Sequence, residues 1–521
     1  MSDLRHKSKR GWIGDRKGMI LPIALIFLVV LSIMGIAAIM TATSTTGLFG
    51  GLRRADEALY NAEAGVEVAK RIIAQENPNF DQVYANAGQL PGLEGIVSYG
   101  NGSYTVLIVN NEDDPGFGSD LERDGRYIVH STGRVSDAVK TLEVVVESFS
   151  RFFYFTEWEE APGTAAEADW VKKFVFFRTG DNLDGPVHSN HALHIGGNPV
   201  FTALASSNES PYKLTGSADD SAIFLGGSNW SRYVSLPVGP DGVFGTADDL
   251  VDVKTGADAK GTVIDTYDTG TAKPWDYRVH FRGDRGPEVD IHKKDPADAD
   301  WTFVETLTIG AGFNGVVYFH GGGPIHVGGK IKDTGSDRGK LSSSGVESTV
   351  QGRWTICSAS ESTDLITTAG ELQVEGDIKY EGNHTAGGDP FPSLDPDDPP
   401  QGLLGLVSAN NVVIKENLED DAQAIRANGI TIHASIMATS NENATFSVET
   451  ALIDGVPGSL NRPINLLGGI IQSRRGVVGI FDIVGLITGF DKNYMYDPRL
   501  YYMTPPSFPL ALNLKVKSWK E

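Results

Sequence analysis

Acidic residues gather in two segments of the sequence where they could bind a cation. Asp241, Asp248 and Asp249 lie in a glycine-rich segment, GPDGVFGTADDL. The second segment lies between two predicted strands and contains Glu112, Asp113, Asp114, Asp120, Glu122 and Asp124. Calcium is bound by several converging oxygen ligands, but neither segment has the spacing of an EF-hand loop. Each segment is therefore a candidate calcium site or a solvated acidic turn.

Three histidines and the single cysteine are the other candidates for chemistry. His188, His191 and His194 are three residues apart. On a strand, the first and third would face one side and the second the other. Glycine and proline nearby exclude a helix, so the pattern favours turn or rung histidines over a zinc site. Cys357 lies in a predicted strand, WTIC, and is expected to be a small buried residue.

Sequence motifs of common enzymes are missing from the chain. It has no GxxxxGK[ST] phosphate loop, no GxSxG elbow and no HExxH pair. Carboxylates such as Asp181 and Asp184 leave one enzymatic alternative, a secreted polysaccharide lyase or hydrolase built on a parallel β-helix. Abundant carboxylates alone do not make a catalytic pair, so we expect no enzyme activity.

Composition bounds the class of protein. The 521 residues include 67 acidic and 44 basic side chains, a formal charge of −23, together with 61 glycines and one cysteine. This acidic balance argues against a nucleic-acid groove, and one cysteine excludes an internal disulfide framework. With 40% hydrophobic residues the chain can bury large cores, and its many glycines favour turn-rich β structure.

The N-terminus is unlike the rest of the chain. Residues 1–18 carry a net positive charge. The segment from Met19 to Met40 carries no charged residue and is long enough for a membrane-spanning helix. Basic residues before the span indicate that the leader stays in the cytoplasm and that the chain after Met40 is exported. Three interpretations remain open: a signal peptide that ends at Gly35-Ile36-Ala37, a plain signal anchor, or a leader cut before the span.

The third interpretation follows from a resemblance. Lys17-Gly18-Met19, at the start of the apolar segment, resembles the class III leader of type IV pilins, which prepilin peptidase cuts after the glycine. After the span, Leu59, Ala62, Val66, Ala69 and Ile73 follow a helical period, which predicts one long helix over 19–75. With the NAEAG segment, residues 17–75 resemble the start of X-type minor pilins of type IV pilus assembly. The resemblance implies cleavage after Gly18 and N-methylation of Met19.

One position departs from this family. Its members commonly carry a glutamate as the fifth mature residue, where the carboxylate pairs with a neighbouring subunit inside the membrane. In this sequence that residue is Ile23. The resemblance is therefore closer to rare subunits than to the repeating subunit of a filament shaft.

Two β regions follow the helix. Residues 102–111, 125–135 and 140–149 alternate apolar and polar side chains and predict an antiparallel meander that covers the apolar stripe of the helix. Beyond Phe153, short β-branched segments end at Gly, Asn or Asp, which favours stacked rungs of a parallel β-solenoid without a fixed repeat length, although an irregular β-sandwich is the alternative. This body, with GDIKY, LLGLVSANNVVI and the closing YDPRLYYMTPPSFP, resembles the solenoid-like domains attached to X-type pilin starts.

The resulting fold prediction is a pilin-like long α-helix with a small antiparallel β domain, followed by a large mainly-β domain. Its expected parts are a leader at 1–18, the helix at 19–75 with its span at 19–40, a β headgroup at 76–150, a solenoid-like domain at 151–495 and a C-terminal tail at 496–521.

The function expected from this organisation is that of a minor pilin-like subunit, at the tip of a type IV pilus or in its initiation. It would sit in the inner membrane of a bacterium with its C-terminus outside the cytoplasm, and later at the cell surface. Expected partners are prepilin peptidase, other pilins through 19–75, and a surface or polysaccharide ligand; nucleic acid is not expected. A pseudopilin of type II secretion is a further alternative, and calcium is the one candidate cofactor.

Overall fold

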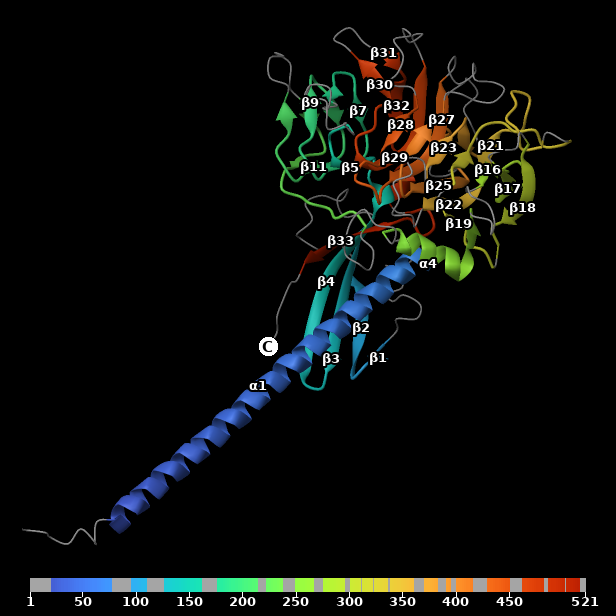
Figure 1. The fold of residues 1–521 in the computed structure, drawn as a ribbon. Helices are drawn as coiled ribbons and strands as arrows, with labels where there is room; N and C mark the ends of the chain where they lie inside the picture. The colour runs from blue at the N-terminus through green and yellow to red at the C-terminus, as the bar shows by residue number, and fades with distance from the viewer. Residues whose placement is uncertain are drawn as a thin grey trace, which may run out of the picture.

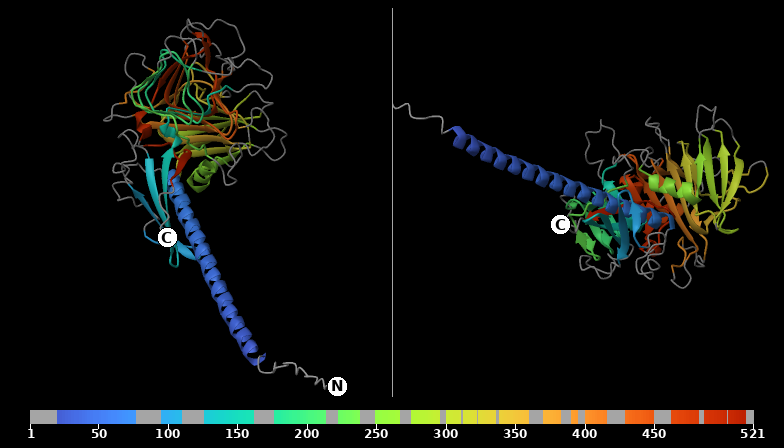
Figure 2. Two further views of the ribbon diagram at one scale, coloured as in Figure 1. Left: turned by 90° about the vertical axis from the view of Figure 1, so that its left-hand side faces the viewer. Right: turned by 90° about the horizontal axis from the view of Figure 1, so that it is seen from below.

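The structure is a computed structural model, and it describes most of the chain. The described residues are 20–76, 95–109, 126–161, 176–213, 222–237, 249–266, 275–295, 300–310, 312–321, 323–335, 338–359, 370–382, 390–394, 400–415, 429–449, 462–481, 486–501 and 503–515. A long helix extends away from a broad β body, and a small sheet lies where the two meet (Figures 1 and 2).

Helix α1 runs without interruption from Ile20 to Glu76. At 1.5 Å per residue, its 57 residues extend over about 85 Å. Its first half is apolar all round, and its second half is amphipathic. The prediction of one continuous helix is confirmed within the described residues.

A five-stranded antiparallel sheet packs against the second half of α1. Its strands are, in order, β1 (Val97–Tyr99), β2 (Gly102–Val109), β3 (Arg126–Val135), β4 (Ala138–Ser148) and β33 (Leu510–Lys515). The predicted meander corresponds to β2, β3 and β4. We refer to this sheet with the second half of α1 as the headgroup.

The last strand corrects the expected division of the chain. Residues 496–521 were predicted as a tail, yet β33 within them pairs antiparallel with β4, from Leu510 opposite Ser148 to Lys515 opposite Glu143. The chain therefore leaves the headgroup at β4, forms the body, and returns to the headgroup at its end. The sequence alone did not show this, because strand pairing across more than 350 residues leaves no local pattern.

The body is built mainly from parallel strands, as expected for stacked rungs. Its 13-stranded sheet has ten strands on its main path. They are, in spatial order, β14 (Ser228–Asn229), β11 (Ala205–Ser207), β8 (Val187–Ser189), β5 (Tyr154–Trp158), β29 (Pro463–Arg474), β27 (Ile430–Ala438), β25 (Gly402–Ser408), β22 (Gly352–Ala359), β19 (Val316–His320) and β15 (Thr262–Asp265). Beside this path lie β21 (Ser348–Val350), β24 (Ile378–Tyr380) and β32 (Asp491–Met495).

Smaller sheets and short helices complete the body. The seven-stranded sheet contains β18 (Thr302–Thr308), β17 (Glu288–Lys294), β16 (Asp276–Phe281), β20 (Ile325–Val327), β23 (Leu372–Val374), β26 (Val412–Ile414) and β28 (Phe446–Val448). Two three-stranded sheets consist of β13 (Ile223–Phe224), β10 (Val200–Phe201) and β7 (Asn182–Leu183), and of β12 (Tyr212–Lys213), β9 (His194–Gly196) and β6 (Phe177–Arg178). The remaining elements are β30 (Gly479–Phe481), β31 (Leu486–Gly489), α4 (Val251–Lys260), η2 (Phe149–Arg151) and η4 (Pro498–Tyr501).

The order of rungs in the stack is not the order of the sequence. The chain enters the stack at β5, in its interior, and builds outward through β8 and β11 to β14. It then continues at the opposite edge with β15 and returns through successive rungs to β29. Strand β29 pairs parallel with β5, so the two parts of the stack meet at a seam inside one continuous sheet.

The spacing between neighbouring rungs varies widely. Hydrogen-bonded residues on adjacent rungs are 18 positions apart at His188 and Ser206, 34 apart at Thr431 and Asn465, and 50 apart at Gln351 and Gln401. Loops of different length between short strands account for this variation. It explains why the sequence shows no fixed repeat.

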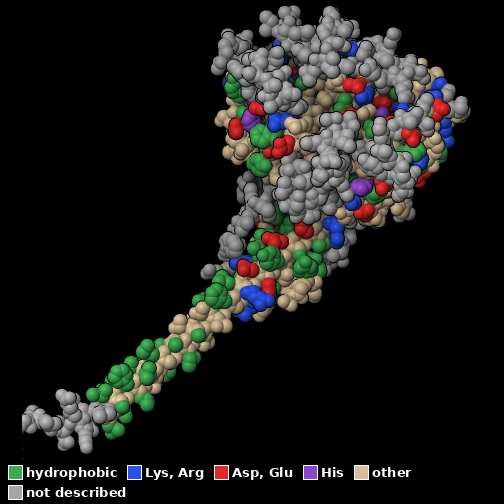
Figure 3. All heavy atoms as spheres, viewed as in Figure 1, with side chains coloured by type: hydrophobic (Ala, Val, Ile, Leu, Met, Phe, Trp, Pro, Cys, Tyr) green, Lys and Arg blue, Asp and Glu red, His purple; other side chains and the backbone are tan. Residues whose placement is uncertain are grey.

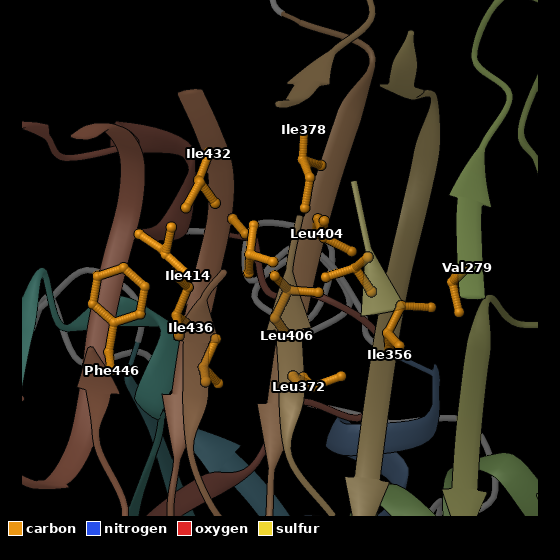
Figure 4. Packing of buried hydrophobic residues seen from close by; sticks show 14 of the residues in the cluster. Val279, Ile356, Leu372, Ile378, Leu404, Leu406, Ile414, Ile432, Ile436 and Phe446 are labelled. Carbon is orange, nitrogen blue, oxygen red and sulfur yellow. The ribbon is translucent and has the colours of Figure 1, made fainter. Parts of the chain in front are cut away.

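Columns of side chains connect the rungs inside the body. One column of register partners crosses the seam without a break and consists of Val317, Ile356, Leu406, Ile436, Ile470, Tyr154, Val187 and Ala205. Figure 4 shows Ile356, Leu406 and Ile436 packing with Leu372, Ile414 and Phe446, which the seven-stranded sheet supplies to the same core. The hydrophobic effect over this contiguous core stabilises the stack.

The column predicts how stability responds to mutation. Ile436 is fully buried, so Ile436→Ala should lower the free energy of unfolding by about 2–5 kcal/mol, measured by urea denaturation of the detergent-solubilised chain. Val304→Ala is the control, since Val304 is 41% exposed on the edge strand β18, and it should change this free energy by less than about 0.5 kcal/mol. Equal effects of the two substitutions would contradict the assignment of the core.

Candidate functional site

The first half of α1 exposes apolar side chains along its length. Residues 21–49 are exposed, and they include Leu21, Ile26, Phe27, Leu31, Met34, Ile39 and Phe49, each more than 60% exposed. Figure 3 shows this green surface on the helix where it projects from the headgroup. By length and composition the helix can cross a membrane. None of the side chains from Leu21 to Phe49 is buried in the structure.

Five hydroxyl groups on this half of the helix are satisfied internally. Ser32 donates to the carbonyl of Leu28 over 2.8 Å, and Thr41 donates to the carbonyl of Ala37 over 2.9 Å. Thr43, Thr45 and Thr46 make the same bond four residues back. An apolar environment requires such internal bonds, because it offers no water.

The predicted processing residues lie at the start of this helix. Lys17, Gly18 and Met19 fall outside the described residues. Ile23, at the position of the family glutamate, lies on the exposed helix with 49% of its surface accessible. The helix therefore presents an aliphatic side chain where the family commonly presents a carboxylate.

The second half of α1 lies flat on the sheet because small residues face each other. Ala58, Ala62 and Ala69 are fully buried against the sheet. A Cβ atom at Gly133 of β3 would collide with the backbone of Ala58 and Ala62, and one at Gly65 would collide with the Ser131 hydroxyl. Close approach of helix and strand therefore requires glycine at Gly133, where the contacts are to backbone, whereas a larger residue at Gly65 would force side chains such as Ser131 to move.

The NAEAG segment gains a structural role from this packing. Asn61 is 5% exposed and donates from Nδ2 to the carbonyl of Arg134 over 3.3 Å. Ala62 and Gly65 form the close contact, while Glu63 points to solvent. Asn61 and Gly65 were not recognised individually from the sequence, although their segment was.

A buried carboxylate joins the headgroup to the body. Glu147 of β4 is fully buried and accepts from Arg151 over 3.1 Å and from Arg232 over 2.5 Å. Arg232 follows β14, at the end of the stack, so this ion pair links the two parts of the molecule. Nearby, the hydroxyls of Ser148 and Thr504 are 2.9 Å apart. Removal of one partner from such a buried network is costly, because the other is left as an unpaired charge.

A second apolar cluster fills the space between headgroup and body. It contains Phe149, Phe152 and Phe155 from the segment that enters the stack, Val253 and Ala257 from α4, and Phe508 and Ala511 from the returning segment. Cys357 is fully buried in this cluster, and burial raises the pKa of its thiol. The prediction of a small buried cysteine agrees with this position.

The acidic segments predicted as calcium sites are only partly described. Asp113, Asp114, Asp120, Asp124, Asp241 and Asp248 lie outside the described residues. Asp249 precedes α4 and is 2% exposed. Over the described ranges, no group of three or more His, Cys, Asp or Glu side chains is arranged to hold a metal ion. The calcium sites stay a prediction.

The three predicted histidines occupy different environments. His188 lies in β8, fully buried, with one ring nitrogen 2.8 Å from the Ser206 hydroxyl and the other 2.8 Å from Oδ1 of Asn190. Burial lowers its pKa to about 3. His188 and His194 lie on rungs and His191 lies in a bend between them, which agrees with the prediction of turn or rung histidines. The ring centroids of His191 and His194 are 5.8 Å apart. Residues 190–193 form a corner between β8 and β9, so strand alternation does not apply there.

The two carboxylates of the enzymatic alternative both have structural partners. Asp181 accepts from the backbone amide of Arg178 over 2.8 Å, and Asp184 accepts from the amide of Tyr496 over 2.9 Å. The first bond closes a turn, and the second ties an early rung to the C-terminal segment. Burial raises the pKa of Asp184.

The polar face on the meander of β16, β17 and β18 was not predicted from the sequence. His280 and His292 are fully buried there, and within the described residues neither ring has a hydrogen-bond partner. Arg282 donates to Asp290 over 3.1 Å and to Asp333 over 2.9 Å. The alternation of Tyr277, Val279 and Phe281 with Arg278, His280 and Arg282 was the available signal.

Charges surround these two histidines from several elements. Arg278, Arg282 and Asp284 face His280, and Arg278, Asp290, Asp333 and Arg338 face His292. Burial, as the main cause, lowers the pKa of His280 to about 3 and that of His292 to about 4. Both rings are therefore neutral at pH 7.

Comparison with known proteins gives a limited set of similarities. Residues 124–209 match a family described as a domain of unknown function, DUF4900. No curated protein matches the chain. Among solved structures, the crystal structure of the competence-associated pilin ComZ from Thermus thermophilus matches with 11% identity and a TM-score of 0.33, over 89% of this chain and 98% of that one. This TM-score is too low to show a common fold.

The buried histidines predict that the body loses stability in acid. An unfolded histidine has a pKa of about 6.5, so below this pH the unfolded state binds protons that the folded state excludes. The free energy of unfolding should fall as pH decreases from about 6.5 towards 4, by of order 2 kcal/mol per histidine at pH 5. Urea denaturation at pH 7.5, 6 and 5 measures the change.

A double variant isolates the contribution of the meander. The variant His280→Phe with His292→Phe keeps an aromatic ring at each position but removes both titratable groups. The pH dependence of the free energy of unfolding should therefore weaken by about half or more. If the free energy of unfolding fell equally steeply with pH in the variant and in the unaltered chain, these two histidines would not be the cause of the acid sensitivity.

Proposed function

We propose that this chain is a pilin-like minor subunit of a type IV pilus or of a related secretion filament. The observation that carries the proposal is the division of α1. Its first half exposes apolar side chains, and its second half packs flat on an antiparallel sheet through Ala58, Ala62 and Gly133. A helix of this kind suits a membrane first and a bundle of similar helices afterwards, because both surround it with apolar groups.

The proposed mechanism begins with processing. Basic residues hold the leader 1–18 in the cytoplasm, and prepilin peptidase cuts after Gly18. The mature helix then waits in the inner membrane of a bacterium, with the headgroup and body outside the cytoplasm. Assembly transfers α1 from lipid to the helices of neighbouring subunits, so its apolar side chains stay away from water throughout.

The size of the body supports a position for this subunit at the tip of the filament or a role in its initiation. It is far broader than the headgroup and extends to both sides of it (Figure 1). In a helical shaft, a body of this size would collide with subunits above it, whereas a tip subunit has none above it. Ile23 also supports a tip position, because a subunit that repeats along the shaft would use the glutamate that the family commonly carries at this position. At the tip, the body would be displayed for adhesion or for contact with other minor subunits.

Processing is the first test of this proposal. Intact-mass analysis and N-terminal sequencing should find a mature chain that begins at N-methylated Met19. Gly18→Val should block cleavage and leave residues 1–18 attached, because the peptidase requires the glycine. Gly14→Val, in the same leader, is the matched control and should be cleaved normally. A mature start near Ala38 would contradict the proposal and leave a secreted β protein.

Stoichiometry tests the place in the filament. Sheared and purified filaments should contain this chain at less than about one-tenth of the amount of the main subunit, and antibodies against the body should label filament ends in electron micrographs. The control is an antibody against the main subunit, which should label the whole length. Labelling by the body antibody along the shaft would contradict a tip position.

A further inference from the structure

A hairpin-like segment covers the polar face of β16 and β17. It follows β20 and leads to β21, and it comprises residues 330–346, of which 330–335 and 338–346 are described. We name this segment the strap. Backbone hydrogen bonds join its two arms: Ile331 and Val346 bond each other in both directions, over 3.1 and 2.9 Å, and Lys332 donates to the carbonyl of Lys340 over 2.9 Å. Because these bonds lie within the strap, it can move as one unit without losing them.

Charged side chains tie the strap to the meander. The ties are the hydrogen bond from Arg282 to Asp333 at 2.9 Å, the hydrogen bond from Arg278 to the carbonyl of Gly339, the ion pair between Arg338 and Asp290 at 3.6 Å, and the ion pair between Lys340 and Asp300 at 2.7 Å. Such ties depend on the balance of charge around them.

Apolar side chains anchor the meander and the strap in different places. Val279 of β16 and Ile291 of β17 belong to the contiguous core of the body. Ile331 and Leu341 of the strap are buried, but among the described residues they are not members of that core. Release of the strap would therefore leave the meander and the body in place.

Two histidine rings lie between the meander and the strap. A Cβ atom at Gly339 would lie 2.8 Å from the His292 ring, so the backbone of the strap closes directly over this ring. His280, on the neighbouring strand, lies between Arg278 and Arg282 on the same face. Both rings are fully buried, and within the described residues none of their nitrogens has a hydrogen-bond partner. No direct hydrogen bond would therefore stabilise a positive charge on either ring.

The charged groups that face the two rings carry both signs in equal number. They are Arg278 and Arg282 of β16, Asp284 after it, Asp290 of β17, and Asp333 and Arg338 of the strap. The third strand, β18, contributes uncharged groups, with Phe303 against His292 and Thr306 donating to Asp290. On the far side of Arg278, Glu375 pairs with both Arg278 and His326. Protonation of His280 or His292 would add an unbalanced positive charge to this buried set.

We propose that acid opens the strap: protonation of His280 and His292 releases it from the meander while the body stays folded. With the strap closed, charged rings would be buried beside arginines and away from water, which is costly. With the strap open, water hydrates the rings and screens the arginines. This response does not depend on the pilin-like function proposed above, since every group involved lies in the body.

The direction of the response follows from proton binding. Burial lowers the pKa of His280 to about 3 and that of His292 to about 4, whereas an exposed ring has a pKa of about 6.5. The open state therefore binds protons that the closed state excludes, and acid favours it below pH 6.5 or so. Between pH 7.5 and pH 5, each released ring should raise the ratio of open to closed strap by about 30-fold.

Distances between spin labels on the full chain in detergent test the proposal. Labels on Thr334→Cys in the strap and Val304→Cys on β18 should give one short distance at pH 7.5 and a second, longer one as the main population at pH 5. Cys357 is fully buried and should not react with the label. Val304→Cys with Val263→Cys is the control pair, because both residues are 41% exposed on edge strands of the body, and its distance should stay the same at both pH values.

Two variants separate the role of charge from that of folding. His280→Phe with His292→Phe should keep the short distance at pH 5. Asp333→Asn removes the partner of Arg282 and should show the longer distance already at pH 7.5. Asp137→Asn is the matched control for this substitution, since the Asp137 side chain is 78% exposed on the headgroup, and it should behave as the unaltered chain does.

Three results would overturn the proposal. The first is an unchanged distance between the strap and β18 from pH 7.5 to pH 5. The second is a simultaneous change in the control pair, which would mean that the body unfolds as a whole. The third is opening at pH 5 in the double histidine variant to the same extent as in the unaltered chain.

Discussion

The parallel pairing of β29 with β5 is the interaction on which the rest of the structure depends. Strand β29 is the longest strand of the body and contacts β27 on one side and β5 on the other. Without this seam, the rungs from β5 to β14 and those from β15 to β29 would be two short stacks, each with an additional open edge. Since β5 follows β4 almost directly and β29 precedes the returning segment, the seam also places both connections to the headgroup side by side.

Buried charges reinforce the same region. Glu147 connects β4 to Arg151 and Arg232, and Arg475, just after β29, pairs with buried Glu159 over 2.7 Å. Arg499 donates to the carbonyls of Pro400 and Gly402 while it pairs with Asp497. Such networks add little net stability, but they penalise any other arrangement of the strands, because a displaced partner would leave a charge buried alone. They specify how the headgroup and the stack meet.

Local patterns in the sequence predicted the local structure well. The uncharged span and the 3-4 spacing of Ala62, Val66 and Ala69 defined α1, and alternation defined β2, β3 and β4. The order of the rungs could not be predicted, because the pairing of Tyr154 with Ile470 joins distant residues. The polar face on β16, β17 and β18 was also missed, because it forms only when Arg282, Asp290 and Asp333 from separate elements come together.

The interior position of the seam determines how the molecule would carry a load. A solenoid attached by its last rung can be peeled, since tension then breaks one strand pairing at a time. Here the covalent connection from α1 passes through β4 into β5, which is paired on both flanks by β8 and β29. A pull between the body and the helix would therefore shear several ladders together, and neither end of the stack would be the first to yield. The permuted order of the rungs makes the attachment point one of the best-supported strands of the fold.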